Sequence, residues 1–155
     1  MVPGPARFSR LFATPAFPAG NGPDFVNAAV ALGTDLAPED ILDRLHRIEA
    51  GAGRTRDRRW GERTLDLDLL AVGDLIRPDV ATVERWRTLP LARQMEETPD
   101  RLLLPHPRLQ DRSFVLVPLA EVAPAGWRHP ISGLTVDEML AALPPADLAS
   151  VRPLE

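Results

Sequence analysis

The chain has 155 residues, 45% of them hydrophobic, and a net charge of −4, which is typical of one folded domain with a hydrophobic core. The mild acidity argues against general nucleic-acid binding, and no apolar run approaches the ~20 residues of a membrane span. The sequence lacks cysteine, which excludes disulfides and thiolate metal sites, and all 18 basic residues are arginines, which excludes a Walker lysine or a lysine nucleophile. A cytoplasmic location is the default expectation.

The N-terminal part predicts two strands joined by a loop rich in proline and glycine. Residues 7–13 are typical of a short strand, which the loop at 14–23 interrupts. Residues 24–34 are apolar enough for a core strand, with Asn27 as the polar residue in its middle. A polar side chain there needs a hydrogen-bond partner. Two interpretations stay open: a structural hydrogen bond to a neighbouring loop, or an amide that recognises a heterocyclic ligand.

A helix is predicted from Pro38 to about Glu49. Proline suits the first turn of a helix, and the acids at 39 and 40 suit the positive end of its dipole. One apolar stripe is formed by Ile41, Leu42, Leu45 and Ile48. Glu49 is unfavourable at a helix C-terminus, which indicates another role for its carboxylate, although an exposed glutamate is the default.

The stretch 54–70 combines an arginine-rich loop with a predicted strand. The loop carries Arg54, Arg56, Arg58, Arg59 and Arg63 beside Trp60. In the strand, Asp66 and Asp68 are two residues apart and therefore project from one face, while the leucines between them face a core. Paired carboxylates can hold hard divalent cations together with substrate phosphates, and guanidinium groups bind phosphate oxygens. The alternatives are that the arginine-rich loop is simply solvated and that the two aspartates are ordinary polar residues on the solvent face of a strand.

Further along, residues 81–95 are compatible with a helix broken at Pro90, and 77–101 with a surface excursion or a lid. Prolines on both sides stiffen the backbone of His106. Its arginine neighbours, Arg101, Arg108 and Arg112, favour a phosphate ligand and lower the histidine's pKa, so it would be a weak general base.

The C-terminal part contains one ambiguous segment and one clear helix start. Residues 115–122 suit either a buried strand or a short helix, with Asp111 or Ser113 as a possible cap. Thr135 followed by Glu138 predicts a capping box that begins a helix ending near Leu143. The proline-rich tail is expected to be frayed.

Taken in order, these motifs resemble 6-hydroxymethyl-7,8-dihydropterin pyrophosphokinase, a folate-pathway enzyme family, from about Phe8 to Leu143. The run 59–68, R-W-G-x-R-T-L-D-L-D, is highly specific. Weaker matches are Thr14-Pro15, the run 23–28, Glu49 followed by Gly53-Arg54-x-Arg56, Pro105-His106-Pro107, and 112–119. The resemblance implies an α+β fold, a ferredoxin-like α/β sandwich with a mostly antiparallel sheet, as a single domain over 1–155.

The resemblance also implies the reaction: pyrophosphate passes from ATP to the hydroxymethyl oxygen of the pterin, giving AMP and the pterin diphosphate in tetrahydrofolate biosynthesis. Two Mg²⁺ ions would be bridged by Asp66 and Asp68, with Arg54 and Arg63 on a mobile catalytic loop. The positions matching the family's ATP side are Glu49, Arg59, Trp60, Arg101, His106 and Arg112. The pterin side would comprise Thr14, Phe17, Phe25, Asn27 and Phe114. A monomer without nucleic-acid or membrane partners is expected.

The chain departs from the family pattern at its start. Family members begin with a strand reading A-x-x-G-S-N and a helix before the segment that matches residues 8–13, and this sequence starts without them. We therefore expect an N-terminally incomplete domain, through a misplaced start or a real truncation. The segment 85–99 also looks longer than usual. The alternative function is a truncated, non-catalytic homologue that binds nucleotide or a partner. An unrelated phosphodiesterase is disfavoured, since no further carboxylate or histidine cluster completes a two-metal set.

Overall fold

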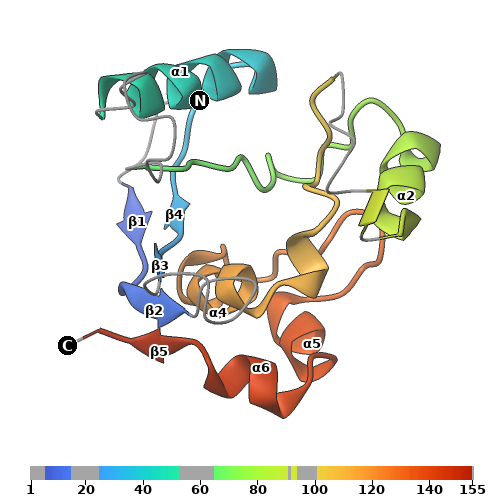
Figure 1. Cartoon of the computed structure of the whole chain (residues 1–155). Coiled ribbons are helices and arrows are strands. Elements are labelled where there is room, and N and C mark those ends of the chain that lie inside the picture. Colours follow the sequence, from blue (N-terminus) through green and yellow to red (C-terminus); the bar gives the residue numbers. More distant parts are fainter. Residues whose placement is uncertain (1–5, 15–24, 53–64, 91, 94–100, 155) are drawn as a thin grey trace.

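The computed structural model of the protein describes residues 6–14, 25–52, 65–90, 92–93 and 101–154 (Figure 1). The elements in chain order are β1 (Arg7–Phe8), β2 (Phe12–Thr14), β3 (Phe25–Asn27), β4 (Val30–Ala31), α1 (Pro38–Gly51), α2 (Val80–Thr88), η1 (Leu109–Asp111), α4 (Ser113–Val122), α5 (Val136–Ala141), α6 (Pro145–Ala149) and β5 (Arg152–Pro153). The strands all pair antiparallel, so the predicted α+β class is confirmed. Among the described helices, none combines the length and apolarity needed to cross a membrane.

The strands form two small sheets. In one, β2 lies between β3 and β5, and in the other β1 pairs with β4. The register of the hairpin sets Phe12 opposite Asn27 and Thr14 opposite Phe25. The strand predicted over 7–13 is divided into β1 and β2, and the strand predicted over 24–34 is divided into β3 and β4. The tail was expected to be frayed, but it forms α6 and β5. Pairing of β5 with the edge of β2 holds the end of the chain in place.

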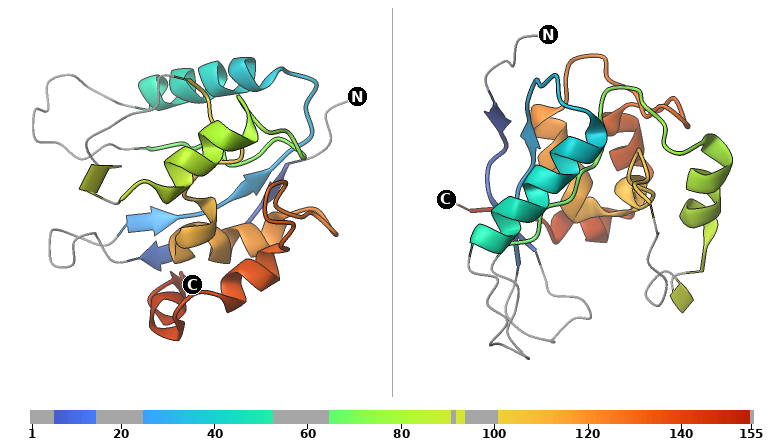
Figure 2. Two further views of the ribbon diagram at one scale, coloured as in Figure 1. Left: turned by 90° about the vertical axis from the view of Figure 1, so that its right-hand side faces the viewer. Right: turned by 90° about the horizontal axis from the view of Figure 1, so that it is seen from above.

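The prediction that residues 24–34 form a core strand is wrong in its burial. Phe25, Val26 and Val30 are all exposed, whereas Ala29 is buried. The helix that packs against these strands is α4, which covers one of their faces. In Figures 1 and 2, the described helices lie on one side of the strands. Several apolar side chains of the strands remain exposed to solvent.

The ambiguous segment 115–122 is helical. It belongs to α4, whose apolar side chains face both the strands and α5. An α-helix satisfies its backbone hydrogen bonds internally and presents side chains in several directions, which suits a segment that packs against neighbours on more than one side. The capping prediction is wrong: Arg112 is the N-cap and supplies no side-chain bond, Asp111 ends η1, and Ser113 is already helical. The main core cluster joins η1, α4 and α5 through Leu109, Leu116, Val136 and Met139.

The helices α1 and α2 lie away from this core (Figure 2). The predicted start of α1 at Pro38 is confirmed. Its stripe is shifted, because Ile48 is 54% exposed whereas Glu49 is only 4% exposed. The helix predicted over 81–95 with a break at Pro90 corresponds to α2, which ends at Thr88, and to helical residues at 92–93. Proline cannot continue the backbone hydrogen-bond ladder, so the helix stops there.

The capping box predicted for α5 is confirmed. The Thr135 hydroxyl accepts the Glu138 N–H at 3.1 Å, and the Glu138 carboxylate accepts the Thr135 N–H at 3.0 Å. Hydrogen bonding of the Glu138 carboxylate to Thr135, first to its backbone N–H and then to its side chain, holds the pKa of Glu138 below its usual range. The helix is shorter than predicted, ending at Ala141 instead of near Leu143.

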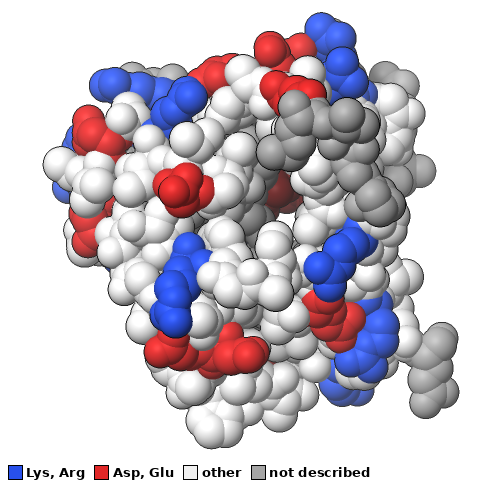
Figure 3. Space-filling view, turned by 180° about the vertical axis from the view of Figure 1, so that it is seen from behind, with Lys and Arg blue, Asp and Glu red and all other residues white. Residues whose placement is uncertain are grey.

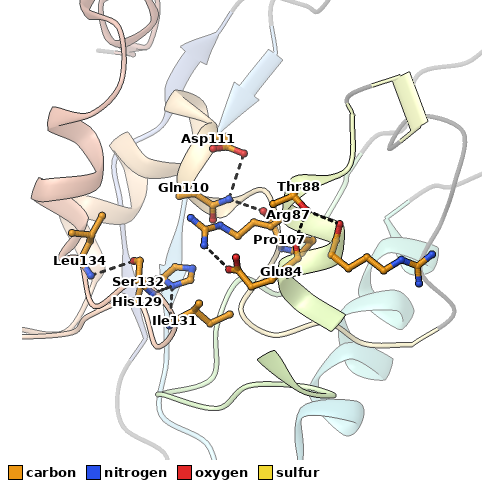
Figure 4. Close-up of polar contacts among 11 residues, drawn as sticks. Glu84, Arg87, Thr88, Pro107, Gln110, Asp111, His129, Ile131, Ser132 and Leu134 are labelled. Carbon is orange, nitrogen blue, oxygen red and sulfur yellow. Dashed lines mark hydrogen bonds and ion pairs between the residues drawn. The ribbon is translucent and has the colours of Figure 1, made fainter. Parts of the chain in front are cut away.

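A buried histidine links the turn before α5 to α2. His129 is 1% exposed, and its Nδ1 accepts the N–H groups of Ile131 and Ser132 at 3.2 Å each. Its ring faces the ion pair of Glu84 and Arg87 on α2 (Figure 4). Burial, followed by the charge of Arg87, lowers the pKa of His129 below 6.5. The neutral ring is therefore the form that fits the fold.

We predict that His129→Ala lowers the free energy of unfolding by about 3 kcal/mol, because removal of the buried ring leaves a cavity and the N–H groups of Ile131 and Ser132 lose their acceptor. His129→Asn keeps an acceptor and should lose less. Because the folded-state pKa lies below the unfolded one, the wild type loses stability as pH falls below about 6.5, and both variants should lack His129's share of that loss. Urea unfolding at pH 7.5 and 5.5 measures both effects. The exposed His46→Ala is the control, and an unchanged stability of His129→Ala would contradict this role.

Candidate functional site

The segment that carries Asp66 and Asp68 is extended but is not a strand. From residue 65 to 69 exposure alternates, with both aspartates exposed and the three leucines half-buried. The predicted alternation is therefore present, while the predicted strand is wrong: residues 65–72 take part in no sheet ladder. Isolated groups, rather than a neighbouring strand, hydrogen-bond to this backbone at Leu67 and Leu70.

These isolated contacts tether the segment along its length. The Leu67 N–H donates to the Glu49 carboxylate at 2.7 Å, and the Leu70 carbonyl accepts the His106 N–H at 2.8 Å. The Leu70 side chain packs on the core cluster. Further along, the Trp127 indole N–H donates to the Gly73 carbonyl at 3.0 Å. The backbone that carries the aspartates is thus held between them, at Leu67, and after them, at Leu70 and Gly73.

Arg112 interacts electrostatically with the two aspartates and with a second arginine, Arg108. Its guanidinium is half-buried, and burial, followed by the charge of Arg108, lowers its pKa. The opposing charges come from Asp68, Asp111 and Asp66. Both carboxylates of the predicted metal pair therefore lie close enough to Arg112 to affect its ionisation. Its guanidinium also lies over the ring of Phe114, 5.6 Å from the centroid.

His106 lies beside Arg112 and Arg108. Burial is the largest of the effects that lower its pKa from 6.5 to about 4, followed by the charges of Arg112 and Arg108. The predicted direction is confirmed, although sequence reasoning found only the smaller cause. Its Nδ1 accepts the Arg108 N–H at 3.1 Å, which assigns the proton of the neutral ring to Nε2. At neutral pH, His106 can therefore donate a hydrogen bond without carrying charge.

Arg108 was noted in the sequence only as a neighbour of His106. Its Nε is buried and has no hydrogen-bond partner within the described part of the chain, and its ion pair with Asp111 is long at 3.7 Å. A partly desolvated cation of this kind attracts anions. The sequence signal was its place directly after Pro105-His106-Pro107. By contrast, Arg101 acts on Asp79, the N-cap of α2, whose pKa is held low first by hydrogen bonds to Thr82 and then by this charge.

Residues predicted for the pterin side meet on the β2–β3 hairpin. The Asn27 amide donates to the Thr14 hydroxyl at 2.8 Å, and Thr14 is directly opposite Phe25 in the register. The partner of Asn27 is thus a neighbouring strand rather than a loop. Phe25 and Phe114 both expose part of their rings, and Phe114 lies in the first turn of α4, which packs against β2 and β3.

Five predicted site residues lie outside the described residues: Phe17, Arg54, Arg59, Trp60 and Arg63. The described residues contain no cluster of three or more His, Asp or Glu side chains suited to a metal. Asp66 and Asp68 offer two hard oxygen donors, which fits an Mg²⁺ ion that completes its shell with water and phosphate oxygens. Viewed from behind, the surface is hollowed near its centre, and an acidic side chain lies inside the hollow (Figure 3).

Comparison with known proteins gives a consistent result. Residues 3–124 match the family model described as 7,8-dihydro-6-hydroxymethylpterin-pyrophosphokinase (HPPK). The 2-amino-4-hydroxy-6-hydroxymethyldihydropteridine pyrophosphokinase of Pseudomonas aeruginosa is 45% identical over 79% of this chain and 62% of its own length. Proteins of the same name from Synechocystis and Methylorubrum extorquens are each 41% identical, over 85% and 82% of this chain and 54% and 66% of their own lengths.

The chain therefore spans less than two thirds of the length of these relatives. The family model nevertheless covers most of its residues, including both aspartates, His106, Arg112 and the β2–β3 hairpin. On this match, the chain belongs to the 7,8-dihydro-6-hydroxymethylpterin-pyrophosphokinase family.

Proposed function

We propose that this protein transfers the pyrophosphoryl group of ATP to 6-hydroxymethyl-7,8-dihydropterin, giving AMP and the pterin diphosphate for tetrahydrofolate synthesis. Membership of the family supports the choice of reaction. The observation that carries it is that Asp66 and Asp68 are both exposed and both act on the half-buried Arg112. Phosphoryl-type transfer requires a cation-binding site beside an anion-binding site. The proposal includes a monomeric enzyme that acts in the cytoplasm.

The ATP side is proposed around these charges. Asp66 and Asp68 would hold Mg²⁺, two ions in the full proposal, and bound Mg²⁺ would offset phosphate charge. Arg112 and Arg108 are permanent cations for phosphate oxygens, and neutral His106 can donate from Nε2. The remaining proposed ATP-side and catalytic residues are Glu49, Arg54, Arg59, Trp60, Arg63 and Arg101.

The pterin side is proposed on the hairpin and the start of α4. A flat heterocycle with polar edges needs aromatic faces and a few well-placed polar groups. Phe25 and Phe114 offer partly exposed rings, and the bond to Thr14 orients the Asn27 amide. Because this bond uses one amide N–H, the carbonyl oxygen and the second N–H of Asn27 are the groups proposed to recognise the pterin edge. Phe17 completes this set.

In the proposed reaction, the hydroxymethyl oxygen forms a bond to the β-phosphorus of ATP. The bond from this phosphorus to the oxygen bridging to the α-phosphorus breaks, AMP leaves, and the hydroxymethyl proton passes to water. Such a transfer depends on positioning and charge stabilisation more than on a protein base. The low pKa of His106, about 4 through burial and then its arginine neighbours, agrees with a donor role.

The direct test identifies the nucleotide product. With Mg²⁺, ATP and the hydroxymethyl pterin, the protein should release one AMP per pterin diphosphate formed. Phosphorus NMR or chromatography distinguishes this from ADP, which would refute pyrophosphoryl transfer. If ATP binds in calorimetry but no AMP forms with the pterin, the protein is a nucleotide-binding homologue instead.

We predict that Asp66→Asn and Asp68→Asn each lower the transfer rate by a factor of about 10² or more, since each removes one anionic ligand from the proposed metal pair. Both residues are exposed, so unfolding temperatures should change little. Asp74→Asn, an exposed acid in the following turn, is the matched control. Turnover of either variant within a factor of two of wild type would exclude the metal role.

For His106 we predict a neutral ring with the proton on Nε2 throughout the physiological pH range. Nitrogen NMR should show this tautomer at pH 7 and titration near the pKa of about 4 that burial and the two arginines produce. Loss of its neutral donor in His106→Ala should raise the KM for ATP about tenfold, corresponding to ~1.4 kcal/mol. His46→Ala should leave KM unchanged. A histidine that titrates near pH 6.5, or an unaltered KM, would contradict the assignment.

A further inference from the structure

Glu49 is a buried acid in an unfavourable position. It lies in the last turn of α1, 4% exposed, and that turn contains no basic residue. Both the negative end of the helix dipole and removal from water disfavour a carboxylate there. A buried acid of this kind is tolerated when it makes strong hydrogen bonds, and its Oε2 accepts the Leu67 N–H at 2.7 Å.

The position of this bond in the sequence suggests what it does. The Leu67 N–H belongs to the peptide group that joins Asp66 to Leu67, between the two proposed metal ligands. In an extended chain, neighbouring side chains point in opposite directions, so fixing one peptide plane sets the direction of the side chains on both sides. A bond at Leu67 therefore restrains the rotation of the segment that carries both carboxylates.

The other tethers lie on the C-terminal side of the aspartates. The Leu70 carbonyl bonds to His106, and the Leu70 side chain packs in the core. No sheet ladder orients residues 65–72 in the described structure. Among these contacts of the described residues, the bond from Leu67 to Glu49 is the one that lies between the two aspartates.

We propose that Glu49 is a positioning residue, whose carboxylate holds the Leu67 peptide so that Asp66 and Asp68 face a shared divalent cation. This inference rests on the proposed function and deepens it. The family resemblance assigns Glu49 to the ATP side. Its burial and its bond to Leu67 favour an action through the metal ligands over direct contact with the nucleotide.

The test uses four variants of the full chain. Glu49→Gln keeps an oxygen acceptor at the same reach, Glu49→Ala removes it, and Glu49→Asp withdraws it by one methylene. Glu39→Ala, an exposed glutamate in the first turn of the same helix, is the control. If Glu49→Ala fails to fold, Glu49→Asp provides the comparison.

Two measurements test the hydrogen bond between Glu49 and Leu67 without requiring enzymatic turnover. Hydrogen exchange of the Leu67 amide should be slow in wild type, Glu49→Gln and Glu39→Ala, and at least tenfold faster in Glu49→Ala and Glu49→Asp. Paramagnetic broadening of amides 66–68 by Mn²⁺ should need about tenfold more metal in the same two variants, as expected when a group that orients metal ligands is lost.

Turnover then links the tether to the reaction. The half-saturating Mg²⁺ concentration for transfer should rise about tenfold in Glu49→Ala and Glu49→Asp, with little change in the KM for the pterin, and Glu49→Gln should recover most of the loss. A purely structural role would lower stability without moving the metal dependence. Unchanged Leu67 exchange or unchanged Mn²⁺ affinity would overturn the inference. If wild type releases no AMP, the proposed function fails, whereas the Mn²⁺ and exchange measurements still decide the role of Glu49.

Discussion

The structure depends on how an extended segment outside any sheet presents two carboxylates in fixed directions. Strand pairing would normally supply this rigidity through a ladder of backbone bonds. Here the buried Glu49 carboxylate, the His106 backbone and the Leu70 side chain provide it from α1, from the turn before η1 and from the core. Elements far apart in the sequence thus converge on residues 65–70, and the orientation of the aspartates is a property of the whole fold.

Charge compensation around Arg112 follows from this arrangement. Besides burial, the charges of Arg112 and Arg108 lower the pKa of the half-buried His106, and the charge of Arg108 lowers that of Arg112, which is unfavourable unless negative charge is nearby. Asp66 and Asp68 provide part of that charge, and a polyphosphate would provide more. A site with partly buried fixed charges gains more from binding an anion than solvated side chains do, because less water is reorganised.

The helix α4 connects the two halves of the candidate site. Its N-cap is Arg112, on the proposed phosphate side, and its first turn carries Phe114, whose ring contacts that guanidinium. The same helix packs against the β2–β3 hairpin with Thr14 and Asn27 and against α5 in the core. In the proposed reaction, a rigid element shared by both halves would align the pterin with the triphosphate of ATP.

The sequence by itself determined the features that depend on local chemistry: the start of α1 at Pro38, the capping box at Thr135, the end of α2 before Pro90 and the alternation that exposes Asp66 and Asp68 while half-burying the leucines. The family also followed from ordered motifs. The choice of helix for α4, the pairing of β5 with β2 and the absence of a ladder at 65–72 required tertiary structure, because each depends on which distant segment lies alongside. The same holds for the burial of Glu49 and the partial burial of His106, which arise from packing between elements that no local pattern encodes.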